Sequence, residues 1–479
     1  MNPQTLLNHI HCNFSKKLLL VNLTLISMAV FSQKDSICFS TEITGVYSTG
    51  KYAPFWLQSN RYGRISSSPA STFLSTGIEK AYNKPQRLFD YGFKADLLTR
   101  TDKTKTELFP HELFVKARLA VFNLTVGSRE QIFGNQDSTL SSGGLLFSKN
   151  TRPMPEIGAG IENFTPVPLT LGYVELKGGL RHGWFTDNLY TREILLHHKF
   201  AYIRLGGKLP VHVSYGIEHV AQWGGTDPVY GPLPGGLKNY ARIFLAKSGG
   251  EDASVSDQIN VLGNHIISQG LKLELNVTGI RLNGYWQNIS EDRPIRFIGS
   301  NRINKPDGLW GISIKNSRFP HIRGVLYELL NTTDQSGPYH DKDGLIYGGT
   351  DGYFGGSYPT GWSYYSRTIG TPFITSPLYN ENGTLHTTNS RVRLHHFGME
   401  GNIRGVEYRV LASFSRNYGT YGSPVNMTNK SFLLEVQKYI SLLSGFELSC
   451  SAGSDAGNLF GNSVGVLFSI RKNGLLLKY

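Results

Sequence analysis

Hydrophobic and polar residues alternate along several segments of this chain. In each segment apolar side chains occupy every second position over eight to ten residues, and the positions between them are mostly polar, charged or small. A period of two is typical of a β-strand with one apolar face and one polar face. The alternating segments are residues 89–97, 113–121, 211–218, 271–278 and 406–415.

This alternation fits two architectures, a soluble β-sandwich and a transmembrane β-barrel. Sandwich strands usually have about five or six residues, whereas a strand that crosses a membrane needs about 9–11. The segments here have eight to ten residues, which is closer to the greater length. Their polar face also brings opposite charges together, as in Lys272 with Glu274 and Glu407 with Arg409, which a polar lumen accommodates. Both features favour the barrel.

Aromatic residues and chain length agree with a barrel. Tyr285, Trp286, Trp310 and Tyr439 lie near expected strand ends, where an interfacial girdle places its rings. At about 25 residues for each strand and its connection, the chain accommodates sixteen to eighteen strands. The sequence therefore predicts an all-β, antiparallel transmembrane barrel of about 16–18 strands. We expect little helix, and residues 255–267 are the segment that could form one.

The end of the chain carries a second barrel signal. Residues 463–479 are consistent with a strand, a turn at Asn473 and Gly474, and a short apolar strand that ends in Tyr479. Asn-Gly is the strongest cue for a two-residue hairpin turn. A terminal amphipathic strand that closes on an aromatic residue resembles the assembly signal of outer-membrane barrels. The alternative is an ordinary C-terminal hairpin.

The first 32 residues have the layout of a secretory signal peptide. They contain no acidic residue, two lysines precede an apolar run over residues 18–31, and Val30 and Ser32 stand at the −3 and −1 positions of cleavage. The alternative is a membrane anchor, but the run is shorter than the ~20 residues that a spanning helix needs. We expect residues 1–32 to be removed on export and residues 33–479 to form one outer-membrane barrel domain.

Composition excludes several classes of protein. Aromatic residues make up 12% of the chain, which argues against disorder, and 54 glycines argue against a coiled coil or helical solenoid. Three cysteines cannot form a disulfide-stapled scaffold. Cys38 and Cys450 remain after cleavage, and nothing in the sequence requires them to pair.

The chain is also basic. Its net charge is +13, of which +11 remains once the two leader lysines are removed. An excess of positive charge suggests an acidic partner. For an exported protein we expect acidic polysaccharide or the phosphates of lipopolysaccharide rather than nucleic acid. The alternative is that these cations line the lumen or extend along the lipid boundary.

Two long segments, residues 331–367 and 223–240, interrupt the strands and are rich in glycine and aromatic residues. Long loops are usually functional or disordered, and aromatic richness argues against disorder. Aromatic rings cover the C–H faces of sugars, while carboxylates and guanidinium groups bond to their hydroxyl or carboxyl groups. The alternative is that the rings fill the barrel mouth or lie at the lipid boundary. The candidate polysaccharide-binding residues are Trp223, Asp227, Tyr230, Asp351, Tyr353, Tyr358, Trp362, Tyr364 and Arg367.

Signals for an enzyme or a cofactor are weak. Ser463 lies in a Gly-x-Ser-x-Gly pattern, but a nucleophile elbow needs a following helix and a strand is expected here. The pairs His197–His198 and His395–His396 cannot each hold one metal, because adjacent strand residues point to opposite faces. We expect no catalysis, no metal site and no cofactor.

Four short motifs resemble the capsule assembly Wzi family in its Bacteroidetes-type branch. They are residues 53–57 (Ala-Pro-Phe-Trp-Leu), 60–63 (Asn-Arg-Tyr-Gly), 361–364 (Gly-Trp-Ser-Tyr) and 367–373 (Arg-Thr-Ile-Gly-Thr-Pro-Phe). The resemblance implies an eighteen-stranded outer-membrane barrel that acts as a lectin, holding capsular polysaccharide at the cell surface without catalysis. Enterobacterial members also carry a periplasmic helical bundle, for which this sequence shows no clear counterpart.

The leading hypothesis is thus a monomeric, non-enzymatic barrel of the outer membrane that binds capsular polysaccharide. Its further partners would be outer-membrane lipid and lipopolysaccharide. The charged inward face keeps a porin or carbohydrate channel open as the first alternative. An outer-membrane hydrolase is the second, and it depends on Ser463 alone.

Overall fold

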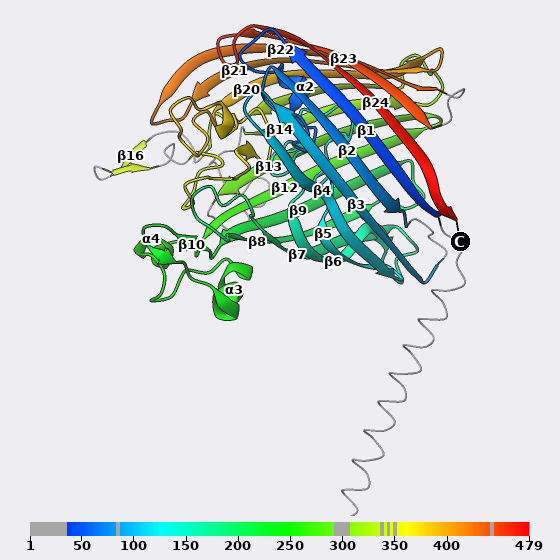
Figure 1. The fold of residues 1–479 in the computed structure, drawn as a ribbon. Helices are drawn as coiled ribbons and strands as arrows, with labels where there is room; N and C mark the ends of the chain where they lie inside the picture. The colour runs from blue at the N-terminus through cyan, green and yellow to red at the C-terminus, as the bar shows by residue number, and fades with distance from the viewer. Residues whose placement is uncertain are drawn as a thin grey trace, which may run out of the picture.

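Eighteen antiparallel strands form one sheet that closes on itself, because β1 pairs with β24 as well as with β2. The structure, a computed structural model, describes residues 36–82, 87–291, 307–335, 340–342, 345–347, 352–440 and 445–478. Figure 1 shows the barrel from the side, with the first and last strands next to each other. The predicted leader lies outside the described residues.

The barrel strands follow one another around the wall in chain order. They are β1 (Ser36–Ser48), β2 (Ala70–Lys80), β3 (Phe89–Asp102), β4 (Thr106–Leu119), β5 (Phe122–Ser128), β6 (Pro155–Pro166), β7 (Val174–Trp184), β8 (Leu195–Leu205), β9 (Val211–Trp223), β12 (Asn264–Val277), β13 (Ile280–Glu291), β14 (Gly308–Asn316), β15 (Gly324–Asn331), β20 (Val392–Ile403), β21 (Val406–Gly419), β22 (Pro424–Ile440), β23 (Phe446–Gly457) and β24 (Ser463–Lys478).

Short elements lie in the connections. The helices are α2 (Phe55–Gln58), α3 (Gly236–Phe244), α4 (Val255–Ile259) and the 3₁₀ turn η1 (Pro377–Tyr379). Three two-stranded pairs are β10 (Thr226–Asp227) with β11 (Gly231–Pro232), β16 (His340–Lys342) with β17 (Leu345–Tyr347), and β18 (Ser363–Tyr364) with β19 (Arg367–Thr368). Within the described residues, no helix has the length and apolar character needed to cross a membrane.

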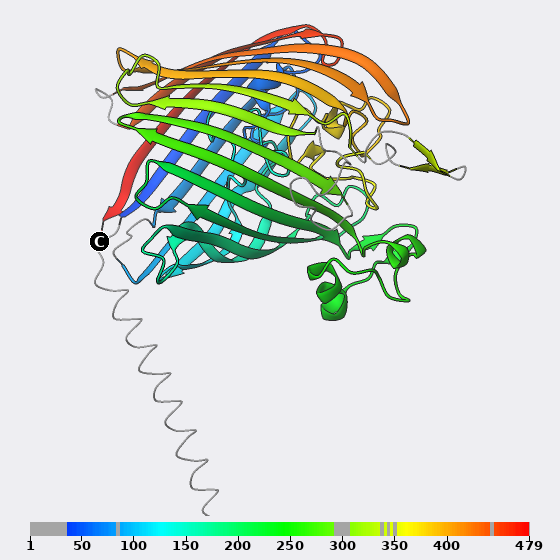
Figure 2. The same cartoon turned by 180° about the vertical axis from the view of Figure 1, so that it is seen from behind.

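The two ends of the barrel differ in their connections. At the end where the described chain begins and finishes, which we call the terminal end, the turns contain two to eight residues. At the other end, the loop end, four connections are much longer: residues 49–69, 129–154, 224–263 and 332–391. Short turns on one side and long loops on the other are typical of outer-membrane barrels. Figure 2 shows the longer connections gathered at the end opposite the C-terminus.

The outer wall is apolar and the inner wall is polar. On β24 the outward Val464, Val466 and Phe468 are each more than half exposed, whereas the inward Leu467 and Ser469 are buried. The same alternation runs around the barrel, with outward Leu, Val, Ile and Phe side chains left uncovered by protein. An apolar outer band is what a lipid environment requires, so the prediction of an all-β transmembrane barrel is confirmed, with eighteen strands.

Three local predictions are wrong. Tyr285 is not part of an interfacial girdle, because its side chain is buried inside the barrel and its hydroxyl donates to Glu328. The segment 255–267 is helical only over α4, because β12 begins at Asn264 and pairs with β9 in the wall. Asn473 and Gly474 do not form a turn, since β24 continues through them and pairs them with Ser40 and Phe39 of β1. Closing the barrel requires a long ladder between its first and last strands, and this ladder overrides the local preference of Asn-Gly for a hairpin.

Candidate functional site

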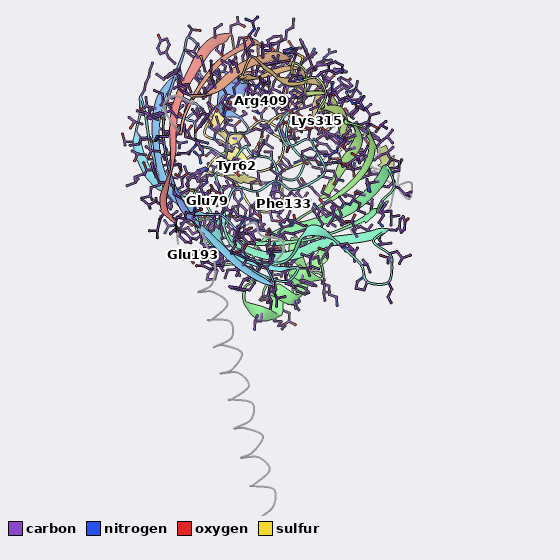
Figure 3. All side chains as sticks on the ribbon, turned by 90° about the vertical axis from the view of Figure 1, so that its right-hand side faces the viewer. Tyr62, Glu79, Phe133, Glu193, Lys315 and Arg409 are labelled. Atoms are coloured by element: carbon purple, nitrogen blue, oxygen red, sulfur yellow. The ribbon has the colours of Figure 1, made fainter. Side chains whose placement is uncertain are left out.

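Three connections from the loop end fold into the barrel instead of extending away from it. Residues 49–69, 129–154 and 352–391 contribute almost half of a continuous buried core, which inward side chains of the wall complete, and we call these three segments the plug. Figure 3 looks along the barrel from the terminal end and shows chain crossing the lumen, with Tyr62 and Phe133 inside the ring of strands. In the described residues the lumen is therefore filled by protein over part of its height.

The first plug segment is fixed to the wall through α2. The Phe55 backbone N–H donates to Asp455 Oδ2 of β23 at 2.7 Å, and Trp56 Nε1 donates to Ser413 Oγ of β21 at 3.1 Å. Pro54 precedes α2, which suits the first turn of a helix because proline lacks the N–H that would be unsatisfied there. A single helical turn thus presents two large rings to the lumen and is anchored to the wall at its first two residues.

The second plug segment is held by polar side chains that point inward from the wall. The Ser142 backbone N–H donates to Glu328 Oε2 of β15 at 2.7 Å, and the Leu145 N–H donates to Gln287 Oε1 of β13 at 2.9 Å. Glu328 is fully buried, as is Ser142. A buried carboxylate is tolerated only where donors satisfy it, so these bonds fix the position of the segment.

The third plug segment packs on the second and on the rim. Trp362 Nε1 donates to Leu146 O at 2.9 Å, and Tyr358 OH donates to Gly224 O at 2.9 Å. The Gln222 side chain of β9 donates to Gly361 O at 3.1 Å. The loop residues predicted to contact polysaccharide therefore stabilise the plug in this structure.

Five of the nine predicted site residues are buried in this way. Arg367 donates to Gln58 Oε1 at 3.1 Å and to Ile65 O at 2.9 Å, and burial lowers the pKa of its guanidinium to about 10. The others in the plug are Tyr353, Tyr358, Trp362 and Tyr364. In these positions the rings face protein and offer no open surface, so they agree with the alternative that the rings fill the barrel mouth. A direct role of these five in sugar binding stays a prediction.

The remaining predicted residues lie in other surroundings. Trp223, at the loop end of β9, packs outward against Tyr240 of α3, with ring centroids 5.4 Å apart. Asp227 accepts a hydrogen bond from the Tyr230 backbone N–H at 3.0 Å, and thus shapes the turn that carries this tyrosine. Tyr230 as a whole residue is 84% exposed, as a sugar-stacking residue requires. Asp351 lies outside the described residues.

A polar cavity of about 300 Å³ lies between the plug and the inner wall. Sequence reasoning did not identify it. The signal that was present is the charged inward positions of the alternating strands, such as Lys94. The other residues that line the cavity, such as Glu42 and Arg471, come from distant parts of the chain, and sequence spacing cannot predict that they meet. The charged side chains that line the cavity are Glu42, Arg61, Arg64, Lys94, Glu130 and Arg471.

Ion pairs organise the cavity wall. Arg64 of the plug lies 3.1 Å from Asp96, 3.3 Å from Glu130 and 3.5 Å from Glu42. Burial raises the pKa of the Glu130 carboxyl, but the hydrogen bond to His111 and the charge of Arg64 outweigh it and bring the pKa to about 2. The carboxylate is therefore ionised at neutral pH and ties Arg64 of the first plug segment to the second plug segment.

The histidines and the serine considered for metal binding and catalysis have the surroundings of ordinary strand residues. His197 points outward to Tyr240, while His198 points inward and lies 3.6 Å from Glu218, so the two rings occupy opposite faces as expected. Ser463 lies at the start of a strand and not at a strand-to-helix turn. In the described part of the chain, no group of three or more His, Cys, Asp or Glu side chains is placed to hold a metal ion. Cys38 and Cys450 are both free and exposed.

Comparisons of the sequence find no matching family model and no matching curated protein. Comparison of the structure finds Escherichia coli Wzi, described as an outer membrane protein involved in group 1 capsule assembly and a carbohydrate-binding β-barrel. The match has a TM-score of 0.55 and 12% identity, and covers 95% of this chain and 88% of that one. Pseudomonas aeruginosa OprD matches with a TM-score of 0.47 and 10% identity, covering 92% and 96%. Acinetobacter baumannii OccAB2 matches with 0.48 and 8%, covering 92% and 98%. At these identities the likeness describes the fold.

Proposed function

We propose that this chain is an outer-membrane β-barrel lectin of the capsule assembly Wzi type, which binds capsular polysaccharide and helps to assemble or retain the capsule. It would act without catalysis. The observation that carries the proposal is the plug, because an interior filled by hydrogen-bonded loops suits a surface-binding barrel better than an open channel. The fold of the E. coli carbohydrate-binding barrel and the four sequence motifs support it.

The polysaccharide would bind at the loop end. There the long connections of a barrel inserted in an outer membrane face the medium, and Tyr230 presents an uncovered ring. The net positive charge of the mature chain favours an acidic sugar polymer. Because the five buried plug residues cannot stack on a sugar as placed, we expect exposed side chains such as Tyr230 to make the direct contacts.

Deletion of the gene tests the proposal in cells. We expect capsule to be released into the medium, measured as the ratio of cell-bound to free polysaccharide, and unchanged retention would contradict the function. A finer test compares Tyr230→Ala with Tyr439→Ala, which removes an exposed tyrosine from β22 near the terminal end. Only the first variant should weaken polysaccharide binding, while both should fold.

A porin or carbohydrate channel is the second candidate, and the charged cavity inside the barrel favours it. Planar-bilayer recordings separate the two functions. A plugged lectin should give no stable conductance steps, whereas a channel should conduct and respond to added oligosaccharide. Stable steps from the unaltered protein would favour the channel over the lectin.

A further inference from the structure

The connection between β9 and β12, residues 224–263, folds back over the outer wall at the loop end. On β9 the outward Val211 and Val213 are 41% and 38% exposed, whereas Ala221 and Trp223, nearer the loop end, are 0% and 4% exposed. A wall that only lipid covers should be exposed along its whole height in the protein alone. Part of the chain itself therefore covers the upper wall here, and Figures 1 and 2 both show α3 beside it.

One face of α3 provides this cover. Ile243 is fully buried, and the Tyr240 ring packs against Trp223. The Tyr240 hydroxyl lies 3.3 Å from His197 Nδ1, and Lys199 Nζ donates to the last carbonyl of α3. His197 and Lys199 point outward from β8. The helix thus rests on the lipid-facing side of β8 and β9, outside the barrel.

The height of α3 on the wall places it at a membrane boundary. Strands rise about 3.3 Å per residue and tilt by about 40° in such barrels, so the strand climbs about 25 Å from Val211 to Ala221. This distance matches the apolar band of outer-membrane barrels, which is ~25 Å tall. The helix therefore lies where acyl chains meet headgroups.

The free face of α3 is apolar. Leu237 and Ala241 of α3 and Leu245 directly after it are all exposed, with Leu237 at 87% and Leu245 at 57%. Their spacing of i, i+4 and i+8 aligns them in one stripe along the helix. Such a stripe is costly in water but stable against lipid, and it continues the apolar outer surface of the strands below it.

Basic side chains flank this stripe. Residues 236–247 contain Lys238, Arg242 and Lys247 and no acidic residue. Arg242 donates to Asn239 and lies 3.9 Å from the Asp252 carboxylate, which leaves the exposed Lys238 and Lys247 as the groups that can meet an anion beside the helix. Apolar residues beside lysines on a short helix are typical of helices that lie in a membrane interface.

We infer that α3 is an interfacial anchor that docks the 224–263 connection onto the outer leaflet. Its apolar stripe would enter the acyl boundary, and Lys238 and Lys247 would meet the phosphate groups of an anionic lipid. The partner is a phosphorylated lipid of the leaflet in which the barrel stands. The inference rests on the proposed placement in an outer membrane but not on polysaccharide binding.

Spin labels on the full barrel test this docking. In a background with both exposed cysteines changed to serine, one label replaces Leu237 and a control label replaces Glu381, an exposed residue of another loop-end connection. The barrels are reconstituted in phosphatidylcholine vesicles with and without lipid A. We expect the label at 237 to collide more often with oxygen than with a water-soluble nickel chelate, and this preference should be stronger in vesicles that contain lipid A. The label at 381 should collide more often with the nickel chelate. Equal access of nickel at both positions in both vesicles would overturn the docking.

Two further variants separate the apolar and the electrostatic contributions. A label at Ala241 should move toward the nickel chelate when Leu237 and Leu245 are both changed to Asn. Lys238→Gln combined with Lys247→Gln should remove the difference between vesicles with and without lipid A, and a difference that persists would overturn the phosphate contact. Heat-modifiable migration on a gel shows that each barrel is folded, and capsule retention measured in parallel keeps this result separate from the lectin function.

Discussion

Replacing Trp56 with alanine tests whether the plug keeps the lumen closed. Trp56 is 2% exposed, bonds to Ser413 and packs against Phe373 and His396. Truncating a buried tryptophan costs about 3–5 kcal/mol. If the packing of Trp56 exists only while the plug is docked, this loss should raise the population of undocked plug roughly 100- to 5,000-fold, because each ~1.4 kcal/mol changes an equilibrium tenfold. Trp56→Phe keeps most of the packing and loses one hydrogen bond worth ~1 kcal/mol, so its effect should be about fivefold.

Planar-bilayer recording measures this population directly as the frequency of brief openings. The matched control is Trp310→Ala, which removes a half-exposed tryptophan from the lipid-facing side of β14. The expected order of opening frequency is Trp56→Ala, then Trp56→Phe, then the control, which should match the unaltered protein. Electrically silent Trp56→Ala barrels that still show heat-modifiable migration would refute the idea that the plug closes the lumen.

Two further predictions concern the plug and its rim. Burial raises the pKa of Asp307 to about 6 despite its backbone donors, so the folded state favours the protonated acid. The stability of the folded state therefore falls by about 3 kcal/mol as the pH rises from about 4 to above 6. Proteolysis of the 332–391 connection should therefore be faster at pH 7.5 than at pH 4.5, and Asp307→Asn should flatten this difference; equal rates in the unaltered protein would contradict it. In Gly370→Ala, the new Cβ would lie 2.0 Å from Leu145 O. The resulting overpacking should destabilise the docked plug by ~1–3 kcal/mol and raise the opening frequency. Gly284→Ala is the control, because its new Cβ would have no atom within 4 Å, and its opening frequency should not change.

The barrel wall could be predicted from the sequence because its chemistry is local. A strand between lipid and a polar lumen must alternate, so the pattern over residues 406–415 already indicates which side chains of β21 face out. The ladder partners of the last strand could not be predicted in the same way. Whether Asn473 and Gly474 turn or continue depends on β1, which lies more than 400 residues away in the sequence.

The plug could not be predicted because composition does not distinguish a buried ring from a binding ring. Tyr358 and Tyr230 both lie in glycine-rich aromatic loops, yet one donates to a backbone carbonyl inside the molecule and the other is open to solvent. The deciding contacts are long-range. Arg367 is placed by Gln58, which lies 309 residues away in the chain, and no spacing rule connects them.

The four motifs that suggested the family resemblance come together in the plug. The residues of 53–57 and 367–373 are in contact, with the Phe55 and Phe373 rings 4.7 Å apart. Trp362, from 361–364, donates to Leu146 of the plug segment 129–154. A lipid-facing strand tolerates any apolar residue of similar size, but a plug must match one particular lumen in shape and in hydrogen bonds. A substitution in the plug must therefore preserve both shape and hydrogen bonds, and for that reason short motifs from a plug can indicate a fold even when overall sequence identity is low.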